Sequence, residues 1–369
     1  MSLQDEIVER SSKIFRDAYQ MSIGELINIY KDGEMDIHPE FQRVFRWSES
    51  QKTRLIESIM LNIPIPSIFV SQNDEGVWDV IDGVQRLSTI FQFVGIFKDE
   101  DNNDIEPLVL QKTDYLPSFE GMMWSNLDNP DKSFTKEQQL AFKRARIDVI
   151  IVKKESDPNT KYELFQRLNT GGSKLSDQEV RNCLMIMTNR EFYVFLDSLS
   201  KNKDFNECIT ITDRKEDEQF KLELILRLLI AVKMNLDDTS NYNDLKELID
   251  RETIKLIENF QMQDYESVKD KFNRTFKLLN ELLGEDSFKK YTDEKHKGPF
   301  LVAAFQGIAS GVYLNIDYVE HVDSDVMIDK IRKFYDEEVY LESTKKGARA
   351  VPRFKDLTLL GKEFFSDED

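Results

Sequence analysis

Cysteine and histidine are scarce in this chain of 369 residues, and their scarcity argues against several classes of site. The sequence has two cysteines, Cys183 and Cys208, and three histidines, His38, His296 and His321. Two cysteines make no disulfide framework of the kind that holds small secreted proteins together. Without a Cys-x-x-Cys pair or neighbouring histidines, a structural zinc site is not expected either. This residue usage fits a cytoplasmic setting.

Long hydrophobic runs are also missing. The most apolar stretch, LELILRLLIAVKMNL at residues 222–236, is interrupted by Glu223, Arg227 and Lys233 and is too short and too charged to span a bilayer. The first 15 residues contain acids and no apolar core, so we predict no signal peptide. The sequence therefore predicts a cytoplasmic protein that has no membrane partner.

Positive charge is in short supply as well. The chain has 50 lysines and arginines against 69 aspartates and glutamates, which gives a formal net charge of −19. This balance argues against broad, non-specific attraction to nucleic acid, although it is compatible with a local basic site. One basic island spans residues 343–355, and its candidates for contact with nucleic-acid phosphates are Lys345, Lys346, Arg349, Arg353 and Lys355. The alternative is a solvated loop that balances an acidic surface.

The first part of the chain mixes strand and helix signals. Residues 63–71, 77–81 and 146–155 have the β-rich composition of strands. A helix is expected from residue 87 to residue 97, because apolar residues recur there along one face. Residues 100–135 are expected to form a polar, irregular insertion.

Helix start signals and helical periodicity dominate the rest of the chain. Ser48 with Gln51, and Ser176 with Glu179, have the three-residue spacing of capping boxes. From about residue 190 onward the patterns are almost all helical, at residues 216–235, 244–262, 264–284, 299–314 and 324–338. We therefore predict an α+β fold, with a small mixed sheet in a domain of residues 1–205 and an all-helical domain of residues 206–369.

The junction VWDVIDGVQRLSTIFQFVGIF, at residues 77–97, joins a predicted strand to a predicted helix. The strand ends at Asp82, and Gly83 begins the helix, with Gln85 and Arg86 in its first turn. The free N–H groups and the dipole of a helix N-terminus favour an anion, and arginine can bind two phosphate oxygens at once. The alternative is ordinary structure, in which Asp82 caps the helix, Gln85 reciprocates and Arg86 is a solvated surface residue.

A second polar stretch, FQRLNTGGSKLSDQEVRN, lies between helical signals at residues 165–182. Its centre can present backbone N–H groups and a lysine to phosphate, through Asn169, Thr170, Gly171, Gly172, Ser173 and Lys174. The spacing is not that of a Walker A loop. The alternative is a helix C-cap followed by the capping box at Ser176.

A third stretch, PEFQRVFRW at residues 39–47, places Gln42, Arg43 and Arg46 beside aromatic residues. The alternative is an edge strand with exposed arginines. In chain order, PEFQRVFRW, LIESIMLNIPIP, IDGVQRLST and FQRLNTGGSKLS resemble the N-terminal domain of the GmrSD-type restriction proteins, a ParB/sulfiredoxin-like family. The resemblance covers residues from about 20 to 235, and it implies a ParB/sulfiredoxin-like fold for the first domain.

The resemblance also implies a site and an activity. In this family an Asp-Gly-Gln-Gln-Arg element is associated with nucleoside triphosphate binding and, in several members, with hydrolysis. The implied nucleotide-binding residues are Gln42, Arg43, Gly83, Arg86, Asn169, Thr170, Gly171, Gly172 and Lys174. The implied catalytic residues are Asp82, Gln85 and Arg86, and Asp82 would also hold Mg²⁺. The expected cofactor is Mg²⁺ with a nucleoside triphosphate, whose base the sequence leaves open.

Two departures from the family pattern lower the expected activity. Val84 stands where the family has its first Gln, and valine cannot position a water, so we expect at most a weak NTPase. Relatives often carry a C-terminal HNH nuclease domain, but His296 and His321 lie in no recognisable nuclease motif. We therefore expect no nuclease activity from this chain itself and a separate protein as effector.

Three functional hypotheses follow. The first is a nucleotide-binding sensor or regulatory subunit of a prokaryotic anti-phage, restriction-type defence system. The second is a DNA-binding module on a ParB-like scaffold, with the basic island as its contact. The third is an antitoxin-like or scaffold protein that restrains a partner effector, since an acidic surface suits a basic partner. DNA binding and homo-oligomerisation both stay open at this point.

Overall fold

The computed structural model describes residues 2, 3, 5, 16–37, 47–73, 75–99, 102–153, 176–212, 215, 219–292 and 294–367. The chain divides into two compact units, residues 1–174 and residues 175–369. Across the described ranges, no helix is long and apolar enough to cross a membrane.

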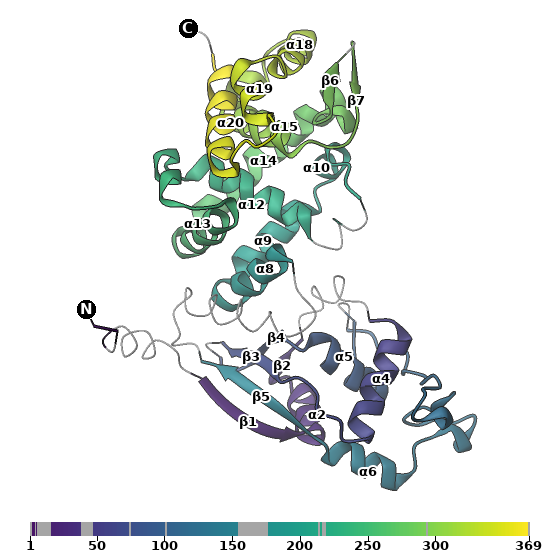
Figure 1. Ribbon diagram of the computed structural model, residues 1–369. Coiled ribbons are helices and arrows are strands. Elements are labelled where there is room, and N and C mark those ends of the chain that lie inside the picture. Colours follow the sequence, from purple (N-terminus) through teal and green to yellow (C-terminus); the bar gives the residue numbers. More distant parts are fainter. Residues whose placement is uncertain are drawn as a thin grey trace. The chain divides into compact units, whose positions relative to one another are not determined.

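A five-stranded sheet forms the centre of the first unit (Figure 1). Its strands are β1 (Arg16–Ser22), β2 (Met35–Asp36), β3 (Ile68–Gln72), β4 (Trp78–Asp82) and β5 (Arg146–Val152), in the spatial order β1-β5-β3-β4-β2. β3 and β4 form an antiparallel hairpin, and β1 is antiparallel to β5, whereas β3 with β5 and β2 with β4 run parallel. The predicted small mixed sheet is confirmed, and its likeness to ParB and sulfiredoxin stays a prediction.

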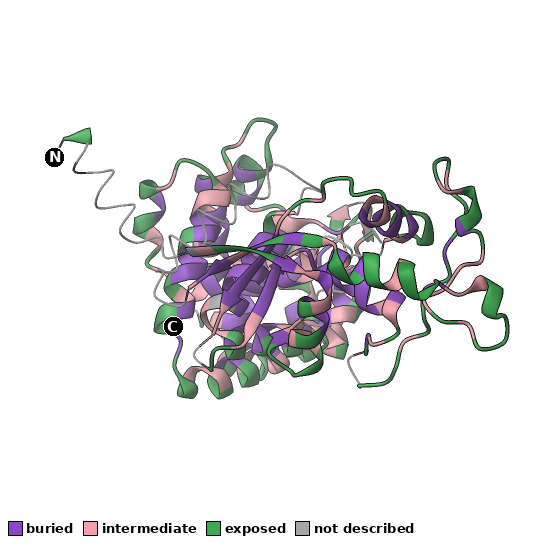
Figure 2. Cartoon of the chain, turned by 90° about the horizontal axis from the view of Figure 1, so that it is seen from below, coloured by how far each residue is buried: buried purple, intermediate pink, exposed green. Residues whose placement is uncertain are grey.

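The sheet is accompanied by the helices α2 (Ile23–Lys31), α4 (Glu49–Met60), α5 (Val84–Val94) and α6 (Lys136–Arg144). The predicted capping box at the start of α4 is confirmed, because the Ser48 hydroxyl accepts from the Gln51 N–H and the Gln51 side chain accepts from the Ser48 N–H. Ile68, Phe69 and Val70 of β3 are all buried, and Figure 2 shows this central part of the sheet in the colour of buried residues. A continuous buried run is expected of a strand covered on both faces.

The insertion between α5 and α6 is irregular, as predicted, but it is not simply polar. It contains the short 3₁₀ helices η1 (Pro117–Phe119) and η2 (Pro130–Lys132). Leu108, Leu110, Phe119 and Phe134 are buried, and the Phe134 ring lies 5.0 Å from the ring of Phe93 in α5, edge to face. The insertion is therefore partly apolar, and the contact of Phe134 with Phe93 attaches it to α5.

The second unit is helical apart from one short hairpin. Its elements are α8 (Asp177–Thr188), α9 (Arg190–Ser200), α10 (Lys203–Cys208), α12 (Phe220–Lys233), η4 (Leu236–Asn241), α13 (Leu245–Asn259), α14 (Met262–Leu283), η5 (Gly284–Asp286), β6 (Lys290–Thr292), β7 (Lys295–Lys297), α15 (Val302–Ala304), the π-helical turn η6 (Phe305–Ala309), α16 (Ser310–Leu314), α17 (Ile316–Val319), α18 (Ser324–Phe334), α19 (Glu338–Thr344) and α20 (Ala350–Phe364). The β6–β7 hairpin corrects the prediction that this part is all-helical. Three-residue strands with polar side chains give too short a pattern to be read from sequence.

The helix α8 packs with the second unit, whereas the predicted domain boundary lies after residue 205. Arg181 of α8 is 1% exposed, and its guanidinium binds Asp250 of α13 and Glu223 of α12, each at 2.7 Å. The capping box of Ser176 and Glu179 starts this helix, as predicted. The buried ion pairs and the packing of α8 on α9, α12 and α13 explain why the structural division falls at residues 174 and 175.

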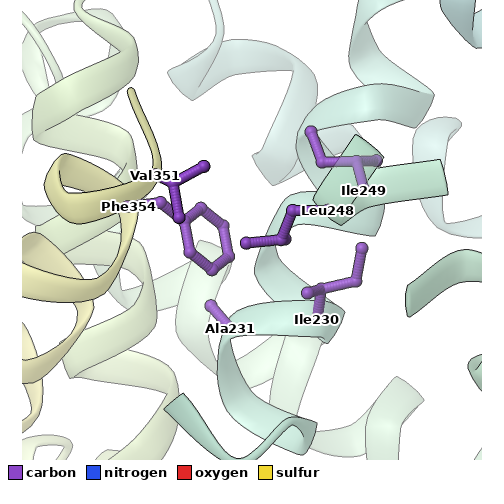
Figure 3. Close-up of a cluster of buried hydrophobic side chains, with 6 residues drawn as sticks. All are labelled: Ile230, Ala231, Leu248, Ile249, Val351 and Phe354. Carbon is purple, nitrogen blue, oxygen red and sulfur yellow. The ribbon is translucent and has the colours of Figure 1, made fainter. Parts of the chain in front are cut away.

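The last helix, α20, is fixed by unusually close backbone packing. A Cβ atom placed on Gly361 of α20 would lie 2.0 Å from the carbonyl oxygen of Gly307, and one placed on Gly311 would lie 2.3 Å from that of Gly361. At its other end, Val351 and Phe354 join a buried apolar cluster with residues of α12 and α13. Figure 3 shows the Phe354 ring pointing from α20 toward Leu248. α20 is therefore held rigidly from both ends.

Candidate functional site

The turn from β4 into α5 requires a glycine for two structural reasons. Gly83 has φ +101°, a conformation that residues with a side chain rarely adopt. A Cβ atom there would also lie 2.4 Å from Cδ1 of Ile68, at the start of β3. The first turn of α5 receives no side-chain cap from any described residue. The alternative in which Asp82 caps this helix is therefore wrong, and its backbone N–H groups keep their capacity to donate.

Arg86 is buried and tightly held. The residue is 8% exposed, its Nη1 donates to the carbonyl oxygens of Pro66 at 2.6 Å and Ser67 at 3.1 Å, and its Nη2 donates to the carboxylate of Asp82 at 2.7 Å. The alternative in which Arg86 is a solvated surface residue is therefore wrong. These bonds tie α5 to the segment that leads into β3. The Asp82 side chain is 48% exposed, so one side of the ion pair faces solvent.

Gln85 connects the junction to the end of the third sequence stretch. Its side-chain oxygen accepts from the backbone N–H of Trp47 at 3.2 Å. β2 runs parallel to β4, so the chain leaves β2 toward the edge of the sheet where β4 ends. Both described flanks of residues 38–46 thus lie near the start of α5. Gln42, Arg43 and Arg46 themselves fall outside the described residues.

The strand that precedes the glycine-rich stretch in sequence, β5, points the opposite way to β4. β5 is parallel to β3 and therefore antiparallel to β4, so the chain leaves β5 toward the edge opposite Asp82. The predicted site residues of this stretch, Asn169, Thr170, Gly171, Gly172 and Lys174, lie outside the described residues. Their placement beside α5 stays a prediction.

Val84 and Asp82 bear on the predicted chemistry. Val84 is buried, at 7% exposure, so its side chain belongs to the core and not to a solvent-facing pocket. Asp82 is engaged by Arg86, and no described group of three or more His, Cys, Asp or Glu residues could hold a metal ion. The Mg²⁺ site at Asp82 stays a prediction, and it would need ligands from a nucleotide or water.

Part of the chain is similar to a known protein family. Residues 23–186 match the family model of the GmrSD restriction endonuclease, N-terminal domain. The match begins at the first residue of α2, includes the Asp82–Arg86 junction, and confirms the resemblance drawn from the four sequence stretches. No curated protein and no solved structure matches the chain. A GmrSD-type N-terminal domain indicates a component of a restriction-type defence system.

The GmrSD match also extends beyond the first structural unit. Its last residues lie in α8, which contains Arg181 and packs within the second unit. Reasoning from sequence missed Arg181, although an arginine on the apolar face of an amphipathic helix is a signal for a buried ion pair. The region that is similar to this family therefore reaches into the helical unit of the chain.

The basic island does not form one free cationic surface. Lys345 pairs with Glu342, and Lys355 pairs with Asp237 at 2.9 Å. Lys346 and Arg349 are exposed and have no carboxylate partner within the described ranges, whereas Arg353 is partly buried and lines a cavity. The island thus separates into paired, exposed and cavity-lining cations.

Proposed function

We propose that this protein is a nucleotide-binding sensor or regulatory component of a restriction-type defence system, and that the start of α5 receives the phosphates of a nucleoside triphosphate. The observation that supports this proposal best is the first turn of α5, which no described side chain caps. An uncapped N-terminus retains N–H donors, and the helix dipole favours negative charge there.

The ion pair of Asp82 and Arg86 is compatible with an anion at this position. A lone carboxylate next to the start of α5 would repel a phosphate. The Arg86 guanidinium, 2.7 Å from the Asp82 carboxylate, compensates that charge. With three of its N–H groups engaged, Arg86 keeps the Nε–H and one Nη2–H as donors for a ligand.

The rest of the proposed pocket comes from the two stretches that the family pattern assigns to it. Gln42 and Arg43 would reach the phosphates from residues 38–46, whose described flanks lie near α5. The glycine-rich residues 169–174 and Mg²⁺ would complete the charge compensation. Turnover would be weak, since the buried Val84 has no polar group that orients a water. A separate effector protein would carry out the response.

The first test is calorimetric titration of the full chain with each common nucleoside triphosphate in Mg²⁺. Replacing Arg43 by Gln should weaken binding about 10- to 150-fold, the value of one charge-assisted contact to phosphate. Arg144→Gln removes the same charge from an exposed position in α6 and should leave affinity unchanged. Absence of binding to every triphosphate by the wild type would overturn the proposal.

The second test concerns Arg86, whose removal should affect both folding and binding. Arg86→Ala leaves the carbonyl oxygens of Pro66 and Ser67 without their donor, which should lower the free energy of unfolding by about 1–3 kcal/mol. It also leaves the Asp82 carboxylate uncompensated beside the proposed phosphate site. If the variant folds and binds the triphosphate as tightly as the wild type, the site lies elsewhere.

A DNA-binding module is the second candidate, because Lys346 and Arg349 are exposed and lack carboxylate partners in the part of the chain that is described. If these residues contact DNA phosphates, the double variant Lys346→Gln, Arg349→Gln should bind DNA more weakly and with a smaller salt dependence. DNA binding that is unchanged in this variant would exclude the basic island as the contact.

A further inference from the structure

A cavity of about 440 Å³ lies within the second unit. It is lined by residues of α12, α13, β6, α15, η6, α19 and α20, by Leu301, and by Tyr335, which follows α18. Its size falls in the range of about 300–1,000 Å³ that is typical of sites for small organic ligands. No part of the proposed triphosphate site contributes to it, because all its lining residues belong to residues 175–369.

The lining of this cavity includes positive charge that no described carboxylate compensates. Arg353 of α20 and Lys290 of β6 line it, and neither has a carboxylate partner within the described ranges. Arg227 also lines the cavity, but its guanidinium is held by Glu223, with Nε 2.9 Å from the carboxylate. The N-terminus of α20 adds a partial positive charge, since no described side chain caps it and Ala350 of its first turn lines the cavity. These features favour a ligand with two negative charges.

Tyr335 provides a second and independent indication of a ligand. The residue lines the cavity and is 3% exposed, yet its phenol oxygen has no hydrogen-bond partner in the described structure. Buried polar groups are nearly always paired, and an unpaired one costs free energy that a ligand can recover. Burial also raises the pKa of Tyr335, so the hydroxyl keeps its proton at neutral pH and can donate it in a hydrogen bond.

The lining of the cavity also includes apolar, well-packed side chains. Phe354 of α20 lines it and is anchored in the cluster of Figure 3, which includes Leu248 and Ile249 of α13. Tyr340 of α19 adds a second aromatic ring to the lining. Aromatic and aliphatic walls with a few polar groups are typical of sites that hold a planar organic body.

We propose that this cavity binds a phosphate monoester on a ring-sized organic body, of which a nucleoside monophosphate is the simplest form. The phosphate lies against Arg353, Lys290 and the start of α20, and the ring lies against Phe354 and Tyr340. A phosphate monoester carries a charge of about −1.5 to −2 at pH 7, which matches the two unpaired cations better than a carboxylate does. On binding, Tyr335 turns its buried, unpartnered hydroxyl toward the ligand and donates to it.

The experiment is calorimetric titration of the full chain, with a non-hydrolysable triphosphate present in excess to fill the proposed site of the first unit. The probes are nucleoside 5′-monophosphates, adenosine, inorganic phosphate and a short single-stranded DNA with or without a 5′-phosphate. Monophosphates should bind with one-to-one stoichiometry, and adenosine should bind much more weakly. Binding of the phosphorylated DNA as well would identify a DNA end as a source of the group, whereas binding of free monophosphates alone would identify a metabolite. If no monophosphate and no phosphorylated DNA binds, the proposal is wrong.

Matched variants separate this site from the surrounding charge. Arg353→Gln should weaken monophosphate binding about 10- to 150-fold. Lys346→Gln, which removes the same charge from an exposed residue that does not line the cavity, should leave it unchanged. If both variants lose monophosphate affinity equally, the loss comes from the lower net positive charge and not from a contact in the cavity. That result would overturn the assignment.

Tyr335→Phe tests the ligand against a purely structural role. It should weaken binding about 2- to 13-fold, the value of one neutral hydrogen bond, while the ligand-free protein keeps or raises its unfolding midpoint. Unchanged affinity would remove Tyr335 from the site and overturn the proposal as stated. Arg86→Ala should abolish triphosphate binding and spare monophosphate binding, so failure of one site can be told from failure of the other.

Discussion

The two units of this protein each bury an arginine, and they satisfy it in different ways. In the first unit, Arg86 is held by two backbone carbonyls and one half-exposed carboxylate, with donors to spare, next to an uncapped helix. In the second unit, Arg181 is enclosed between Asp250 and Glu223 and bonded to Gln178. The comparison teaches when a buried arginine is a candidate for ligand binding. Some of its N–H groups must be unengaged, and its positive charge must not be fully compensated by carboxylates. Arg181, with two carboxylates around it, is structural.

The largest expected effect is the loss of Arg181. Arg181→Ala removes a fully buried side chain and one cationic partner from both Asp250 and Glu223, which keep Lys246 and Arg227 as their other partners. The two lost ion pairs and the cavity left behind should together cost about 3–5 kcal/mol. Urea unfolding measures the change. Arg251→Ala, at an exposed position of α13, is the control and should stay within about 0.5 kcal/mol of wild type. If Arg181→Ala lowers the free energy of unfolding no more than Arg251→Ala does, Arg181 is not the structural residue described here.

A smaller loss is expected from Gly83→Ala, which tests how tightly the α5 junction is built. The left-handed conformation costs about 1–2 kcal/mol for a residue with a side chain, and the clash with Ile68 adds about 1–3 kcal/mol. Ile68→Val removes Cδ1, the atom 2.4 Å from the new Cβ. In that background Gly83→Ala should therefore cost only the conformational part, about 1–2 kcal/mol. Denaturant unfolding of the two single variants and the double variant measures the coupling free energy between Gly83→Ala and Ile68→Val. A coupling of zero would contradict the close packing of these two residues.

Val84→Gln is expected to have an intermediate effect, because it restores the family's Gln at a buried position. Placing an amide at 7% exposure without a prepared partner should cost about 1–3 kcal/mol of stability. Phosphate release from triphosphates, measured at saturating substrate, should rise if this side chain turns toward the proposed site. A stable variant with unchanged release would show that Val84 does not limit turnover.

The smallest effect concerns Arg274, a partly exposed arginine of the second unit. Arg274 binds Glu320 and Asp317, and it holds the pKa of both carboxyls below their ordinary values. The ordinary pKa values are 4.5 for Glu320 and 3.8 for Asp317, and both are lowered in the folded protein. The ion pairs therefore stabilise the fold fully above the ordinary values. This stabilisation is lost as the pH falls through the lowered pKa values of the folded protein. Arg274→Met should flatten this acid-side decline in the unfolding midpoint below about pH 4.5. If the unfolding midpoint of the variant falls at acid pH as steeply as that of the wild type, other carboxyls cause the decline.

Much of the fold could be predicted from local patterns. The capping boxes at Ser48 and Ser176, the β3–β4 hairpin and most helices of the second unit follow from spacing that acts within a few residues. The buried residues of the insertion could not be predicted, because Leu108, Leu110 and Phe134 have no periodicity and find their partners far along the chain. The buried role of Arg181 was missed for the same reason, whereas the β6–β7 hairpin was missed because three-residue strands give too short a pattern.

The candidate site shows the same division. The sequence by itself determined that a strand ends at Asp82, that a helix follows Gly83, and that the order of four stretches is that of a GmrSD-type N-terminal domain. Only the tertiary structure decided that Arg86 binds the carbonyls of Pro66 and Ser67, that Gln85 meets Trp47, and that Arg353 lines a cavity with the unpaired Tyr335 hydroxyl. The physical reason is range: capping and periodicity depend on neighbours in sequence, whereas the partner of a buried donor depends on which distant segment the packing brings to it.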